Sequence, residues 1–370
     1  MLRKISRLVA IVVVPFAVIW ALNMAVASLA GAPATAAKRA TRFGDYALVP
    51  LKHQRLPASV LWSEAPVEAR SVYRDLQAVG DALVVAGGNR LLIIDRTTRV
   101  VETQYDLKQT GLGLVDTTTV GLGPSPDEVW LYSFRSGRSA LASAANGVRG
   151  SVTLEPSLLD AAWVDAHTIL ASGAFGAELL RRFRPVVRPA EPGTSVRFDR
   201  PFGPPLVPGL PPSLAQHLNM SALAVSPSRS LVAVALRWSD RIYVFRAASM
   251  QLERAIAGPS VTKMEFDVTP LRNQQVLAFN DDTAYSYVDI AASDSFIFAL
   301  YSGRSMRDAR TDFGSGAEIH AFTWDGRPVG RWALDESVDK ITVSARGDTL
   351  YGLRSRANSA VIEYVVPDLP

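Results

Sequence analysis

The chain repeats one pattern of apolar and polar positions about six times: a turn of small, acidic or proline residues, an apolar run, a polar break and a second apolar run. The clearest copy has apolar runs at 231–236 and 242–245 on either side of the polar break 237–241. Apolar runs of this length, bounded by Gly, Asp, Ser or Pro, are typical of β-strands in hairpins. A single unit of this kind cannot bury both of its faces, so the repetition predicts units that stack in a ring or a solenoid.

The spacing of the copies predicts an all-β fold, a six-bladed β-propeller. The copies begin near residues 77, 120, 162, 223, 289 and 341, and a four-stranded blade takes about 40 to 50 residues. Two longer intervals predict insertions, one in the stretch 184–212, whose nine prolines exclude a central strand, and one around 268–283. A β-sandwich is the alternative, but six similar units favour radial closure.

The last copy shows only three strands before the chain ends. We therefore expect an earlier segment, the run at 47–49 or the run at 59–62, to pair with the last blade and close the ring. Convincing amphipathic helices are missing from the body of the chain. The whole of 43–370 is thus predicted to form a single propeller domain.

The first 36 residues have the pattern of a signal peptide or a membrane anchor. Arg3, Lys4 and Arg7 precede an uncharged apolar run over 8–22, and small residues follow. Cleavage at 25–27 or 34–36 is favoured because the strongly apolar stretch is only about 15 residues long. The alternative is an uncleaved anchor over 8–30, which is long enough to cross a bilayer. Either interpretation predicts an exported body in the periplasm, soluble or anchored to the inner membrane, after a short basic linker at 37–42.

The net charge of +4 does not indicate nucleic-acid binding. Residues 1–42 carry six Lys or Arg and no acid, which leaves 33 basic and 35 acidic residues in the body. A nearly neutral body gives no electrostatic support for binding a polyanion. Cysteine is absent, which excludes disulfides, thiolate metal sites and a lipid-bearing cysteine.

The last 85 residues resemble the TolB-like six-bladed β-propellers of exported and membrane-anchored bacterial proteins. The similarity is carried by 287–304, 318–329, 334–335 and 348–353. It is clear over about a quarter of the chain. The resemblance implies the propeller fold and an exported location, but no catalytic residues, because the family is largely uncharacterised.

The sequence contains no recognisable catalytic or metal-binding motif, and we expect no cofactor. The four histidines, His53, His167, His217 and His320, show no metal-binding spacing, and His320 lies in a predicted strand, where a hydrogen-bonded structural imidazole is expected. Asp281 and Asp282, with Asp289 near them, are the closest approach to an acidic cluster. For the pair at 281 and 282, solvated loop acids are the expectation.

Arginine recurs in the break between the second and third apolar strands of five of the six units. The residues concerned are Arg90, Arg135, Arg138, Arg237, Arg304 with Arg307, and Arg354 with Arg356. In a propeller these breaks lie on one face, so the arginines are predicted to surround the mouth of the central channel. The planar guanidinium suits carboxylates and phosphates, and Trp238, in the same break as Arg237, is a candidate for ligand contact. The alternative is that these arginines only decorate polar turns.

Three hypotheses of function follow. The first is a non-enzymatic, exported binding protein that engages an envelope protein or an anionic small molecule through these arginines, with the membrane involved only through an uncleaved N-terminal segment. The second is a propeller-type hydrolase or lactonase with a carboxylate-bound cation in the channel, which requires Asp, Asn or Glu on the innermost strands. The third is a structural envelope component tethered by its N-terminus.

Overall fold

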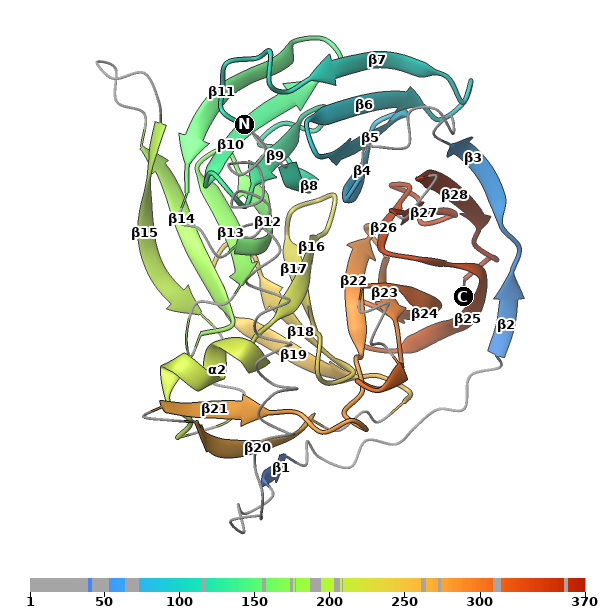
Figure 1. The fold of residues 1–370 in the computed structure, drawn as a ribbon. Helices are drawn as coiled ribbons and strands as arrows, with labels where there is room; N and C mark the ends of the chain where they lie inside the picture. The colour runs from blue at the N-terminus through green and yellow to red at the C-terminus, as the bar shows by residue number, and fades with distance from the viewer. Residues whose placement is uncertain are drawn as a thin grey trace, which may run out of the picture.

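The computed structural model describes residues 39–41, 53–63, 73–114, 117–154, 158–173, 176, 178–186, 194–202, 207, 209–260, 264–271, 274–308, 314–355 and 359–369. These residues form a ring of six β-sheet blades around a central channel (Figure 1). The predicted cleavage sites and anchor at the N-terminus, and the run at 47–49, lie outside the described residues. No helix in the described ranges is long and apolar enough to span a membrane.

Each blade is an antiparallel sheet whose first strand lines the channel. The first blade contains β4 (Asp75–Val79), β5 (Ala82–Gly87), β6 (Arg90–Asp95) and β7 (Val101–Asp106). The second contains β8 (Thr117–Leu122), β9 (Val129–Ser133), β10 (Arg138–Ser143) and β11 (Gly147–Thr153). The third contains β12 (Leu158–Asp165), β13 (Thr168–Gly173), β14 (Leu180–Val186) and β15 (Thr194–Phe202). The outermost strands β11 and β15 also pair with each other, in parallel. The proline-rich stretch thus contributes an outer strand, where a missing N–H is tolerated.

The other three blades complete the ring. The fourth contains β16 (Ser221–Val225), β17 (Leu231–Leu236), β18 (Arg241–Arg246) and β19 (Leu252–Ala257). The fifth contains β22 (Tyr287–Ala292), β23 (Phe296–Tyr301), β24 (Gly316–Thr323) and β25 (Pro328–Val338). The sixth contains β26 (Lys340–Val343), β27 (Thr349–Arg354) and β28 (Ala360–Val365). The sixth blade takes its fourth strand from β3 (Ser59–Ser63), which pairs antiparallel with β28. The preceding strand β2 (His53–Leu56) pairs in parallel with β25 of the fifth blade.

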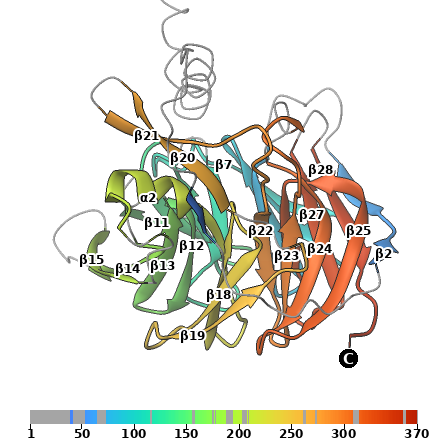
Figure 2. The same cartoon turned by 90° about the horizontal axis from the view of Figure 1, so that it is seen from below.

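Two insertions interrupt the ring at the predicted intervals. The helix α2 (Pro212–Leu218) precedes the fourth blade, and a hairpin of β20 (Met264–Leu271) and β21 (Gln274–Ala278), joined by β1 (Arg39–Thr41), precedes the fifth. In the side view the hairpin rises from the upper rim of the ring, with α2 beside it (Figure 2).

The core consists of six apolar clusters, one between each pair of neighbouring blades. Strands such as β5 and β17 are buried on both faces, which explains why their sequences are continuous apolar runs rather than alternating ones. Burial of each large apolar side chain contributes roughly 1.5 to 3 kcal/mol. The fold therefore depends on contacts between blades, as the repeat predicted.

The repeated turn has a local cause in the last three blades. The hydroxyls of Ser226, Ser293 and Ser344 accept backbone N–H groups of Leu231, Phe296 and Thr349, respectively, at 3.1 to 3.2 Å. A short side-chain acceptor of this kind favours a turn over continuation of the strand. The serine therefore ends the first strand and directs the chain into the second.

Candidate functional site

The two faces of the ring differ in what they carry. Because neighbouring strands within a blade run in opposite directions, the links between second and third strands lie on the same side as the connections between blades. We call this side the arginine face, after Arg90, Arg135, Arg138, Arg237, Arg304 and Arg354, which all lie in or at the ends of those links. Helix α2 and the β20–β21 hairpin belong to connections between blades, so they lie on this face too (Figures 1 and 2).

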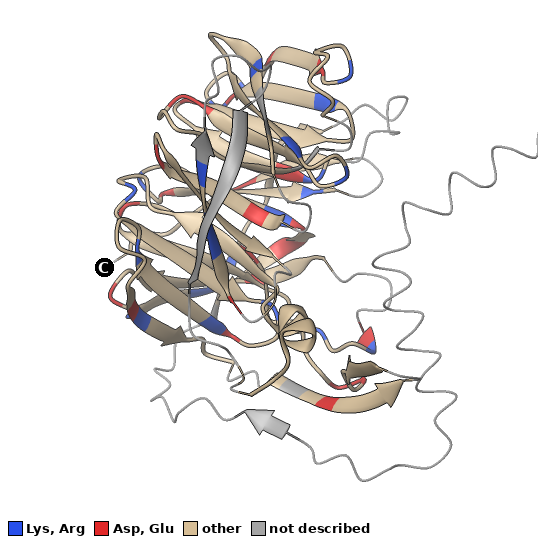
Figure 3. Ribbon diagram, turned by 90° about the vertical axis from the view of Figure 1, so that its left-hand side faces the viewer, with Lys and Arg blue, Asp and Glu red and all other residues tan. Residues whose placement is uncertain are grey.

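The arginines of this face differ in exposure and in partners. Arg135 and Arg138 are exposed, and Arg138 donates to the carbonyl of Leu112 at 3.3 Å. Arg90, at the start of β6, is half-buried. Along the whole ribbon, basic and acidic residues are interspersed (Figure 3). The face therefore has local basic positions on a ring of mixed charge.

Two of the arginine-bearing links are paired with acids. Arg354 forms an ion pair with Glu336, and Arg307 lies 3.2 Å from Asp282, one of the two loop acids expected from the sequence. Arg304 donates to the hydroxyls of Ser315 and Ser337 at 3.4 Å each. Arg356 lies outside the described residues. The guanidiniums at Arg307 and Arg354 are thus partly neutralised within the chain.

Arg237 lies close to the channel. Burial lowers the pKa of its guanidinium, and the nearby Tyr285 and Asp289 partly offset this effect. Its Nε is buried and has no hydrogen-bond partner. An arginine with an unpaired donor beside a channel carboxylate is a strong candidate for a binding role.

Trp238 is buried among the two insertions and the fourth blade. It is only 5 % exposed, and its indole N–H donates to the carbonyl of His217 at the end of α2, at 2.8 Å. Its ring stacks on Phe279 and packs against Tyr285, with centroids 4.2 and 4.6 Å away. The indole therefore holds the two insertions against the fourth blade.

The sequence did not predict a cluster of charged residues at the end of the channel nearest the arginine face, although it singled out Asp289. Asp75, Asp160 and Asp289 lie on the innermost strands of the first, third and fifth blades and are 4 %, 9 % and 4 % exposed. Lys340, on the innermost strand of the sixth blade, lies 3.0 Å from Asp289 and 4.0 Å from Asp75. We call these four residues the acid end of the channel. The signal in the sequence was a charged residue on the innermost strand of each of these four blades, close to the start of each predicted copy.

Each of the three carboxylates also joins its blade to the next. One oxygen of Asp75 accepts the N–H of Val120 at 2.9 Å, and Asp160 accepts that of Leu223 at 2.8 Å. Asp289 accepts the N–H of Ile341 at 2.7 Å. Three of the six junctions between neighbouring innermost strands are therefore bridged by a carboxylate.

Burial changes the proton affinities at the acid end. Desolvation raises the pKa of Asp75 to about 7 and that of Asp160 to about 6. Burial alone would lower the pKa of Lys340, but the charges of Asp289, Asp75 and Asp160 raise it well above its ordinary value. Lys340 is thus a permanent cation, whereas the first two carboxyls titrate near neutral pH.

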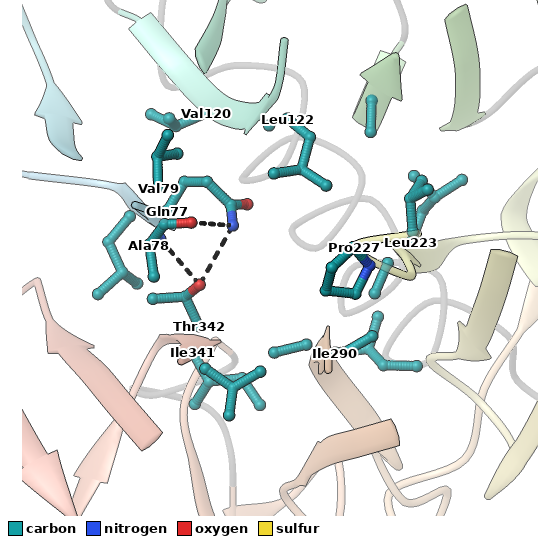
Figure 4. Close-up of a pocket in the computed structure, with 18 of the residues that line it drawn as sticks. Gln77, Ala78, Val79, Val120, Leu122, Leu223, Pro227, Ile290, Ile341 and Thr342 are labelled. Carbon is teal, nitrogen blue, oxygen red and sulfur yellow. Dashed lines mark hydrogen bonds between the residues drawn. The ribbon is translucent and has the colours of Figure 1, made fainter. Parts of the chain in front are cut away.

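Beyond the acid end, the channel forms a cavity of about 260 Å³. Its wall combines apolar side chains with polar and charged ones, among them Gln77, Arg96 and Thr342. Val79, Leu122, Leu223, Pro227 and Ile290 surround the open centre from several blades (Figure 4). At the far end Arg229 reaches from the fourth blade to the second, where it donates to the carbonyls of Gly123 and Pro124 at 2.7 and 2.8 Å. The guanidinium thus joins the fourth blade to the second at the channel lining, on the face opposite the arginine face.

The described residues contain no group of three His, Asp or Glu placed to hold a metal ion. His320 is fully buried, with Nδ1 3.1 Å from the hydroxyl of Tyr287 and Nε2 2.5 Å from Glu318. The prediction of a hydrogen-bonded structural histidine is therefore confirmed.

Comparison with known proteins supports the fold. Residues 200–346 match the model of a family described as TolB-like 6-blade propeller-like. Together with the six blades, this match confirms the resemblance predicted from the C-terminal residues. No curated protein matches the sequence.

Two solved structures are similar to the chain. One is the β-propeller domain of Cps50 (Swd1) from Myceliophteria thermophila, at 12 % identity over 84 % of this chain and 100 % of that one, with a TM-score of 0.49. The other is hydrazine synthase from Kuenenia stuttgartiensis, at 9 % identity over 80 % of this chain and 96 % of that one, with a TM-score of 0.46.

Proposed function

We propose that this protein is an exported, non-enzymatic β-propeller that binds an acidic envelope protein on its arginine face. One observation carries the proposal: both insertions, the arginine-bearing links and the charged end of the channel lie on one side of the ring. Among the described residues, the links on the opposite side are short turns, and there Arg229 reaches from the fourth blade to the second. Binding sites are usually carried by the long loops that a rigid scaffold positions.

Export is inferred from the N-terminal sequence. A basic start, an apolar run over 8–22 and small residues after it are the elements of a signal peptide. The family resemblance also favours a periplasmic location. If the segment stays uncleaved, it would anchor the propeller to the inner membrane and leave the ring in the periplasm.

Arg135, Arg138 and Arg237 are the residues we expect to contact the partner. The first two are exposed on the second blade, and the third is half-buried on the fourth, with a buried Nε that has no hydrogen-bond partner. An anionic small molecule is the other candidate ligand, but Lys340, the cation at the acid end of the channel, already lies beside Asp289 and Asp75. A protein that spans several blades could reach the arginines without entering the channel.

A hydrolase with a channel cation is the second candidate, favoured by the aspartates on three innermost strands. Lys340 supplies a cation to two of them, however, and all three accept backbone N–H groups. Elemental analysis of the purified protein discriminates the two functions: a stoichiometric divalent metal that is lost in Asp160→Asn would support the hydrolase.

Affinity capture from envelope extract tests the binding function. The bait is the full chain, compared with a triple variant of the arginine face, Arg135→Gln, Arg138→Gln and Arg237→Gln. We expect the triple variant to lose the captured protein, because each replacement removes a charged donor from the face. The matched control carries Arg99→Gln, Arg327→Gln and Arg346→Gln, three exposed arginines in turns of the opposite face. Equal capture by both triple variants would contradict the proposal.

A further inference from the structure

The short strand β1 ties the N-terminal part of the chain to the arginine face. It pairs antiparallel with β20, with Arg39 opposite Phe266 and Thr41 opposite Met264. Met264 is fully buried in the core, and β20 runs from there to Leu271 at the tip of the hairpin that rises from the ring (Figure 2). Because β1 runs in the opposite direction, the chain enters it from the side of the tip and continues toward the ring.

Without β1, the chain would reach the ring from the other face. The next strand, β2, pairs in parallel with β25, the outermost strand of the fifth blade. Strand directions alternate within a blade, so β25 runs from the opposite face, where its turn carries Arg327, to the arginine face. The start of β2 at His53 therefore lies toward the opposite face. The pairing of β1 with β20 moves the point where the N-terminal chain first meets the body to the arginine face.

The lengths of chain before β1 and β2 make this difference large. Eight residues, 31–38, separate the apolar run 8–30 from β1, whereas 22 residues, 31–52, separate it from β2. An extended chain spans at most about 3.6 Å per residue, so a bilayer that holds the apolar run would lie within about 30 Å of β1. A tether that began only at β2 could extend to about 80 Å. An anchor tied through β1 thus keeps the arginine face near the membrane.

We propose that the run 8–30 is retained as a membrane anchor and that β1 holds the ring with its arginine face toward the inner membrane. Arg135 and Arg138, which are exposed on that face, then lie on the membrane side of the ring. An acidic partner of this face is accordingly a protein embedded in the inner membrane, a step that rests on the binding function proposed above. The orientation itself requires no partner.

Energy transfer to the bilayer tests the orientation in the full chain, reconstituted in phosphatidylcholine vesicles that contain an acceptor-labelled lipid. The chain has no cysteine, so a donor dye can be attached to one introduced thiol. Ser136→Cys places it on the arginine face and Ala145→Cys on the opposite face; both positions are exposed and they flank the same strand, β10. The length of β10 separates them by about 20 Å. We expect the acceptor lipid to reduce donor fluorescence more at position 136 than at position 145.

A matched control removes β1 without shortening the chain, through Arg39→Gly, Ala40→Ser and Thr41→Gly. The difference between the two labelled positions should disappear in this variant, because a Gly/Ser segment is flexible and disfavours a strand. Equal loss of fluorescence at both positions with β1 intact, or a difference that survives the removal of β1, would overturn the proposal.

Mass spectrometry of the protein isolated from cells tests whether the anchor is retained. We expect the N-terminal run to be present, whereas an N-terminus at residue 28 or 37, after either predicted cleavage site, would overturn the proposal. The vesicles contain only lipid and this chain. A failure to capture an envelope protein would therefore contradict the binding function and leave the measured orientation unchanged.

Discussion

Replacement of Asp160 by asparagine is expected to make the protein more stable at pH 8. The carboxyl of Asp160 has its pKa raised from 3.8 to about 6, chiefly by burial. One pKa unit corresponds to about 1.4 kcal/mol, so ionisation of this group in the folded protein costs about 3 kcal/mol. Asparagine keeps the hydrogen bond to Leu223 and cannot ionise, so the variant should gain up to this amount.

The pH dependence follows from the direction of the shift. Below about pH 3.8 the carboxyl is protonated in both the folded and the unfolded chain, and the two proteins should be equally stable. Between pH 3.8 and about 6 the unfolded chain releases its proton first, so the wild type loses stability as the pH rises. Above that window the loss is complete, and the difference of about 3 kcal/mol should stay constant.

Urea denaturation at intervals from pH 4 to pH 8 measures this difference directly. Asp294→Asn serves as the control, because Asp294 is exposed on the opposite face and accepts the N–H of Ser228 at 2.9 Å. This control should change the free energy of unfolding by less than about 0.5 kcal/mol at every pH. A variant Asp160→Asn that is less stable than the wild type at pH 8, or a difference that does not vary with pH, would refute the reasoning.

Three further perturbations test other parts of the structure by urea denaturation. Lys340→Met should destabilise the protein by about 3 to 5 kcal/mol at pH 8, because it leaves buried carboxylates without their cation; a neutral effect would contradict this. Burial would raise the pKa of Glu318, but hydrogen bonds from His320 and Arg331 lower it to about 2. Glu318→Gln should therefore lower the free energy of unfolding at pH 7, and this loss should shrink as the pH falls from about 4.5 to 2. A loss that is the same at every pH would contradict the reasoning. In β3, Leu61→Ala should cost about 2 to 5 kcal/mol, whereas its neighbour Val60→Ala, at a site 51 % exposed, should cost little; equal effects would argue against the packing of this strand.

The blades were predictable from the sequence because their strands are buried on both faces. Such strands appear as continuous apolar runs, and the predicted start of each of the six copies falls within an innermost strand. Both insertions were visible as long intervals between copies. The sequence did not indicate which elements these insertions form, because α2 and the β20–β21 hairpin are held by contacts with residues distant in the chain, such as Trp238.

The candidate site was only partly predictable. The position of the arginine links follows from strand order alone, but their partners do not: Glu336, which pairs with Arg354, lies 18 residues away in another strand. Asp75, Asp160 and Lys340 were missed because isolated charged residues far apart in the sequence do not indicate a shared site until the blades are arranged. Only closure of the ring brings these residues, far apart in the chain, to one end of the channel.

The central claim is that the arginine face is the surface that meets a partner. Site-specific photocrosslinking in intact cells tests it most directly, with a photoreactive residue placed at Arg135 or Arg138 on that face, or at Arg327 or Arg346 on the opposite one. We predict that crosslinks to another envelope protein form from the first pair and not from the second. Crosslinks that form only from Arg327 or Arg346, or equally from both pairs, would contradict the account.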